Sequence, residues 1–190
     1  MSTMMRLSVP RPAAPDTVAV SAEPTPARGV TRTRRAVPVR GQPADPARPV
    51  ERRDVIVSGG PAGRFRVRAF LPAGVAGPLP VVVCVRDGGD GDLAASLAVD
   101  LSCAVLVPDR GSRTPTVQTE QVYATVEWVA VAGRDHGMDG TRVALVADHA
   151  GAGVADEVML MADRRGGPAP VARVLLSART KAVLRAALAA

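Results

Sequence analysis

One short stretch of the sequence, residues 142–155, has the pattern of a strand, a sharp turn and a helix. The apolar run 143–147 predicts a buried strand, and the Asp-His-Ala-Gly sequence at 148–151 predicts the turn. Such a turn lifts one side chain above the end of a sheet, where the first N–H groups of the helix face it. His149 holds that position, so the chemistry of this site would be that of an imidazole.

Three interpretations of His149 remain open. The positive end of the helix disfavours a charged imidazole, which leaves a neutral ring able to act as a nucleophile. Alternatively, His149 is a decayed position that tolerates change because it points into an open site. A metal site with Asp148 or Asp109 is the weakest interpretation, because no further ligand stands at metal-binding spacing. We therefore expect no metal and no cofactor.

Composition restricts the possible partners. The 190 residues are 47% hydrophobic but only 2% aromatic, and the net charge of +6 comes almost entirely from arginine. A basic chain favours acidic partners, but these arginines are scattered, and few aromatic rings are present to stack on bases. Nucleic acid is therefore not an expected partner.

The cysteines and the termini indicate the compartment. Cys84 and Cys103 both fall inside apolar runs, where cysteine is usually a small inert hydrophobic residue. Their spacing fits neither a disulfide framework nor a zinc site. No apolar run has the length of a signal peptide or a membrane span. We expect a cytoplasmic protein without membrane contact.

The first 50 residues differ from the rest of the chain. Prolines and arginines are interleaved there, and few apolar residues remain to offset the entropy of ordering. The composition predicts a disordered basic leader over 1–50. Its functional alternative is an electrostatic tether, with the densest charge at Arg32, Arg34 and Arg35.

From residue 51 the pattern predicts an α/β fold, with a mostly parallel sheet and helices on both faces. Two strands at 54–57 and 65–71 read as a leading hairpin. Apolar strands then alternate with helices, which indicates a parallel sheet with right-handed crossovers. The expected strands are 81–85, 104–107, 143–147 and 171–176, and the expected helices are 93–101, 117–132 and one ending near 164. We predict a domain over 51–178 and an Ala-rich helical tail over 179–190.

The segment from about 52 to 177 resembles the α/β-hydrolase fold. More closely, it is similar to the hormone-sensitive-lipase and bacterial acetyl-esterase family, over the N-terminal half of that fold. The order and spacing of several pieces carry the resemblance: residues 80–85, 103–109, 123–129, 137–144 and 160–168.

Two chemical motifs of that family have counterparts here. The His-Gly-Gly-Gly loop, which donates backbone N–H groups to an oxyanion, corresponds to residues 86–89, where Gly88 and Gly89 remain. The Gly-Asp-Ser-Ala-Gly nucleophile motif corresponds to residues 147–151. There, His149 stands in place of the serine.

The resemblance implies a carboxylic ester hydrolase that has lost its chemistry. Asp148 matches the motif, and the Ala150 N–H with the two loop glycines would be a remnant of the oxyanion hole. In the family an acid and a general-base histidine follow beyond the last strand seen here, and His136 instead ends a predicted helix. We expect a pseudoenzyme. The alternatives are a weak hydrolase of short-chain carboxylic esters acting through His149, and a basic accessory or binding protein that uses the leader.

The resemblance also bears on assembly. In the family, further strands follow the one expected at 171–176, so that strand would be an exposed apolar edge in a truncated fold. The helix expected at 179–190 could cover this edge, but it offers little surface for that. We expect self-association, or a partner bound at this edge.

Overall fold

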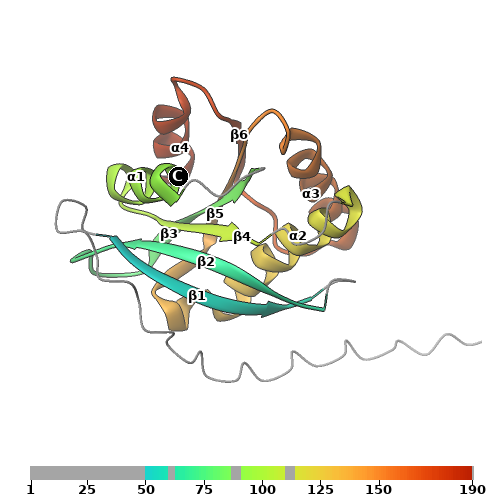
Figure 1. Ribbon diagram of the computed structural model, residues 1–190, viewed down its shortest axis with the longest axis horizontal. Coiled ribbons are helices and arrows are strands. Elements are labelled where there is room, and N and C mark those ends of the chain that lie inside the picture. The colour runs from blue at the N-terminus through green and yellow to red at the C-terminus, as the bar shows by residue number, and fades with distance from the viewer. Residues whose placement is uncertain (1–49, 60–62, 87–90, 110–113, 190) are drawn as a thin grey trace, which may run out of the picture. The chain divides into compact units, whose positions relative to one another are not determined.

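A six-stranded sheet forms the centre of the described part of the chain (Figure 1). The computed structural model describes residues 50–59, 63–86, 91–109 and 114–189. The chain divides into two units, Met1–Arg34 and Arg35–Ala190, and every described residue belongs to the second. The predicted leader, 1–50, therefore lies outside the described residues except for Val50, where the first strand begins.

The strands follow one another across the sheet in the order β1-β2-β4-β3-β5-β6. β1 pairs antiparallel with β2, and β2 pairs antiparallel with β4, whereas β4, β3, β5 and β6 are parallel. The strands are β1 (Val50–Ser58), β2 (Arg64–Pro72), β3 (Leu79–Val85), β4 (Ala104–Pro108), β5 (Met138–Ala147) and β6 (Ala172–Leu175). The predicted fold class, a mostly parallel sheet with a leading hairpin, is confirmed.

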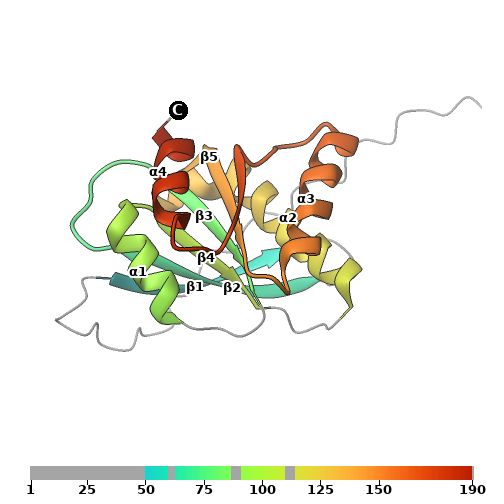
Figure 2. The same ribbon diagram turned by 90° about the horizontal axis from the view of Figure 1, so that it is seen from above.

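Helices cover both faces of this sheet. Figure 2 shows α1 and α4 on one side and α2 and α3 on the other. The helices are α1 (Gly91–Leu101), α2 (Pro115–Ala132), α3 (Ala152–Arg165) and α4 (Thr180–Ala189), with a 3-10 turn η1 (Gly133–His136) after α2. Successive strand residues point to opposite faces, so Val81, Val83 and Val85 of β3 pack beneath α2 and α3, while Val82 and Cys84 pack beneath α1 and α4.

β5 is the element that differs most from its predicted bounds. It begins at Met138, whereas the apolar pattern placed its start at 143. The intervening residues 139–142 are polar or glycine, and across them the pairing with β3 shifts register, from Met138 opposite Leu79 to Val143 opposite Val81. Hydropathy alone therefore locates only the buried half of β5.

α4 packs on the sheet. Leu184 and Leu188 are buried in the apolar cluster beneath α1 and α4. At its start, Thr180 Oγ1 accepts a hydrogen bond from the Ser177 N–H and donates one to the Leu175 carbonyl. The side of α4 that faces the sheet is thus part of the same hydrophobic core as the strand residues beneath it.

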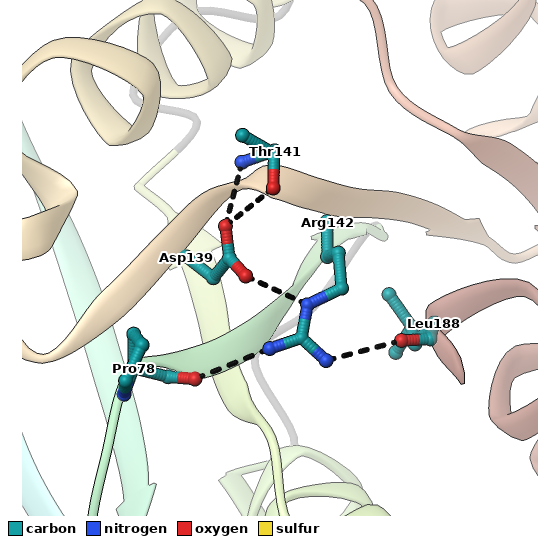
Figure 3. A network of polar contacts seen from close by, with 5 residues as sticks. All are labelled: Pro78, Asp139, Thr141, Arg142 and Leu188. Carbon is teal, nitrogen blue, oxygen red and sulfur yellow. Dashed lines mark hydrogen bonds and ion pairs between the residues drawn. The ribbon is translucent and has the colours of Figure 1, made fainter. Parts of the chain in front are cut away.

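A polar network fixes the other end of α4 (Figure 3). Arg142 of β5 donates to the Asp139 carboxylate at 2.7 Å and to the carbonyl oxygens of Pro78 and Leu188, each at 3.4 Å. The Thr141 hydroxyl and backbone N–H also donate to Asp139. The hydrogen bond from the Thr141 hydroxyl, followed by that from Arg142, lowers the pKa of Asp139 to about 2.

β6 forms one edge of the described sheet. Val171, just before it, and Leu175 within it are 50% and 44% exposed. Arg173 lies between them and pairs with Asp156 of α3 at 2.7 Å. The edge therefore presents apolar side chains to solvent on either side of a paired charge.

Both cysteines lie in the core. Cys84 of β3 and Cys103, which precedes β4, belong to the cluster beneath α1 and α4, and neither forms a disulfide. Burial raises the pKa of each thiol to about 12. Among the described helices, none combines the length and apolar character that crossing a membrane requires.

Candidate functional site

A sharp turn joins the carboxyl end of β5 to the start of α3, and we call residues 147–152 the elbow. β5 ends at Ala147, residues 148–151 form the turn, and α3 begins at Ala152. Gly151 brings the turn against the neighbouring strand β3, because a Cβ atom there would overlap the carbonyl oxygen of Val85. Only glycine permits this approach, and it holds the elbow at the carboxyl end of β3.

Asp148 is held at the elbow by contacts on both of its oxygens. Oδ1 accepts a hydrogen bond of 2.7 Å from the Gly151 N–H, which closes the turn. Oδ2 lies 3.6 Å from Nε of Arg86, the residue that follows β3. Both side chains are about one-fifth exposed. The carboxylate thus connects the elbow to the end of β3.

His149 and Ala150 stand exposed at the top of the elbow. His149 makes no hydrogen bond or ion pair with the described residues. Parallel strands present their carboxyl ends at the same edge of a sheet, and Val85 of β3 pairs in register with Ala147 of β5. The imidazole therefore stands beside the end of β3, where α/β sheets bind ligands.

Other predicted site residues are elsewhere. Gly88 and Gly89, expected in the oxyanion-hole remnant, lie outside the described residues. Asp109, considered as a metal partner for His149, pairs instead with Arg66 of β2 at 3.0 Å. His136 lies in η1 before β5 begins, with its ring 5.0 Å from that of Trp128. The ten residues of β5 separate it from His149, or about 33 Å of extended chain.

Arg86 is the site residue that sequence reasoning missed. Its position directly after a buried strand, and before a glycine-rich stretch, was a signal that could have identified it. In the structure it directly follows Val85, which pairs with Ala147 of the elbow, and its guanidinium forms an ion pair with Asp148. Within the described ranges, no group of three or more His, Cys, Asp or Glu side chains could hold a metal ion.

Comparison with known proteins agrees with this architecture. The sequence profile of the α/β-hydrolase fold matches residues 90–189. The chain belongs to the α/β-hydrolase fold family. The match runs from the start of α1 to the end of α4 and includes the elbow. A search of the curated proteins found no match to this α/β-hydrolase chain.

Solved structures of esterases resemble this α/β-hydrolase chain. Carboxyl esterase 2 from the mycorrhizal fungus Tuber melanosporum is 26% identical with a TM-score of 0.61, over 72% of this chain and 47% of its own. A thermostable esterase from Pseudomonas putida is 26% identical with a TM-score of 0.58, over 68% of this chain and 45% of its own. An esterase from the archaeon Pyrobaculum calidifontis, 24% identical with a TM-score of 0.57 over 65% of this chain and 43% of its own, shares the fold.

These comparisons confirm the resemblance to the esterase branch of the family. They also show its extent, because the chain spans less than half the length of each of these structures.

Proposed function

We propose that this chain binds carboxylic esters at the elbow without hydrolysing them by the serine mechanism. One observation carries the proposal. The exposed residue between Asp148 and Ala150, where the esterase motif has its serine, is His149.

The chemical reason is the missing hydroxyl. In the serine mechanism an activated oxygen attacks the ester carbonyl and forms an acyl-enzyme, while N–H donors stabilise the developing oxyanion. An imidazole at this position has no oxygen to acylate. The elbow itself is retained, because Gly151 still packs against β3 and Asp148 still closes the turn. An elbow that keeps its turn but has no hydroxyl favours binding over turnover.

The test compares turnover with binding on the full chain. We expect p-nitrophenyl acetate and butyrate to be hydrolysed at the same rate by the wild-type chain and by His149→Ala. We also expect ethyl butyrate to shift the backbone amide signals of Ala150 and Gly151 in an NMR titration. Turnover that disappears in His149→Ala, or an ester that leaves these amides unmoved, would contradict the proposal.

A second candidate is slow hydrolysis in which His149 is the nucleophile. It is favoured by the exposure of the imidazole and by its lack of hydrogen bonds to the described residues. A neutral ring nitrogen can attack an activated ester, and the acyl C–O bond breaks to release the alcohol and leave an acyl-imidazole. Water then hydrolyses the acyl-imidazole to the free acid and regenerates the imidazole. A burst of p-nitrophenol, with an acyl mass on the peptide that contains His149, would identify this mechanism. The same burst in His149→Gln would exclude it.

A further inference from the structure

Arg86 carries hydrogen-bond donors that the described residues do not satisfy. Its side chain is 21% exposed, and its Nε atom is buried with no hydrogen-bond partner. The nearest carboxylate oxygen in the part of the chain that the structure describes, Asp148 Oδ2, lies 3.6 Å from Nε, which makes an ion pair but is too long for a hydrogen bond. A guanidinium has five N–H donors and no acceptor, so this pairing offsets its charge without using them.

Two contacts of the elbow keep the Asp148 carboxylate at this distance from Arg86. The other oxygen of Asp148 accepts the Gly151 N–H at 2.7 Å, so the carboxylate cannot turn toward Arg86 without opening the elbow. The elbow cannot move closer either, because Gly151 already lies against the Val85 carbonyl. Arg86 follows Val85 directly, and its backbone is held by the same strand. The unsatisfied donors are therefore a consequence of the backbone arrangement.

Leaving the buried Nε–H of Arg86 without an acceptor is costly, and native structures rarely leave a buried donor so without a reason. A carboxylate is the acceptor that fits, because its two oxygens match the planar fork of an arginine. Arg86 and His149 follow paired positions of β3 and β5, so one small ligand could span both.

We propose that Arg86 binds a carboxylate carried by the ligand of this site. The ligands would then be half-esters of short dicarboxylic acids, with the ester at the elbow and the free carboxylate on Arg86. This inference rests on the proposed function, since it specifies the class of ester that the same site takes.

The experiment measures dissociation constants for monomethyl succinate and for its neutral analogue, dimethyl succinate, on the full chain. We expect the monoester to bind about tenfold more tightly, the increment of one charge-assisted hydrogen-bonded pair. The ratio should fall to about one in Arg86→Gln. It should persist in the control Arg68→Gln, which changes an arginine of β2 that has no hydrogen bond or ion pair with the described residues. Equal binding of the two esters by the wild-type chain, or a ratio that survives Arg86→Gln, would overturn the inference.

Arg86→Lys is the second variant, for the case in which the glutamine variant does not fold. It keeps a cation beside Asp148 but lacks the planar fork, so the preference for the monoester must fall there as well. Full retention of the preference would overturn the inference.

A third probe, succinate, separates the two proposals. If neither ester binds but succinate binds in an Arg86-dependent way, the ester-binding function fails and the carboxylate site stands. If none of the three binds, both proposals fail.

Discussion

Gly151 sets how closely the elbow approaches β3. The change Gly151→Ala would place a methyl group against the Val85 carbonyl and force the turn or the strand to move. We expect a loss of about 1–3 kcal/mol in the free energy of unfolding, as for other overpacked sites. Denaturant unfolding followed by the fluorescence of Trp128, the only tryptophan, measures it.

Gly153, two residues further along, provides the matched control. It lies in α3 with open space around the position of a Cβ. Gly153→Ala should therefore be neutral or stabilise the chain by up to about 1 kcal/mol, the helix propensity of alanine over glycine. Equal losses in the two variants would mean that the close approach of Gly151 is not what constrains the elbow.

Asp139 makes stability depend on acid pH. Its pKa in the folded chain, about 2, is below the ordinary value for aspartate because Thr141 and Arg142 donate hydrogen bonds to the carboxylate. The stabilisation of the folded chain by the ionised Asp139 is therefore complete above about pH 4 and is lost as the pH falls through about 2. We expect Asp139→Asn to be less stable than the wild-type chain at pH 7, with the difference shrinking toward pH 2.

Denaturant unfolding at pH 7, 4 and 2.5 checks this dependence. Asp135→Asn is the control, because Asp135 is exposed and makes no ion pair among the described residues. A difference between Asp139→Asn and the wild-type chain that stays constant across this range would contradict the assignment.

The residues of the site were only partly predictable from the sequence. His149, Asp148 and Ala150 follow from the strand–turn–helix pattern, since a turn after a buried strand places them without knowledge of tertiary contacts. The role of Arg86 depends on the pairing of β3 with β5, which brings together positions about 60 residues apart. Neither local propensity nor hydropathy carries that information.

At the scale of the elements, a few buried side chains hold α4 against the sheet. Leu184 is fully buried, whereas its neighbour Val183 is 47% exposed. We expect Leu184→Ala to reduce the free energy of unfolding by about 2–5 kcal/mol, and Val183→Ala to change it by less than about 0.5 kcal/mol. Urea unfolding of both variants measures the contrast. Similar small effects would mean that α4 contributes little to the core.

The elements themselves were predicted to different degrees, for physical reasons. β3 and β4 are continuous apolar runs because helices cover both of their faces, and the hydropathy of the sequence therefore predicts both strands. The first half of β5 carries the polar residues that form the Arg142 network, so hydropathy does not predict that half as a strand. The packing of α4 on the sheet also depends on contacts with α1 and β6, which lie outside its own sequence.

At the scale of the whole molecule, the two cysteines report whether the described part of the chain unfolds as one unit. Both thiols are buried beneath α1 and α4, and burial raises the pKa of each to about 12. Since the thiolate is the reactive form, a chromogenic thiol reagent at pH 8 should modify them only after opening. Following Cys84 and Cys103 separately, in Cys103→Ala and Cys84→Ala, we expect one common rate.

Two routes of opening would expose these thiols, and Gly151→Ala distinguishes them. If α4 undocks alone, the thiols become accessible without disturbing the elbow, so the substitution would leave their reaction rates unchanged. If β3, β5 and the helices separate together, the opening that exposes the thiols also disrupts the elbow. Destabilising the elbow then lowers the free energy of that opening. We expect the second result. A loss of 1–3 kcal/mol then corresponds to an increase of about 5- to 150-fold in the modification rate of both cysteines, provided that reclosing is faster than modification. An unchanged rate in Gly151→Ala, together with a faster one in Leu184→Ala, would instead show that α4 opens independently of the sheet.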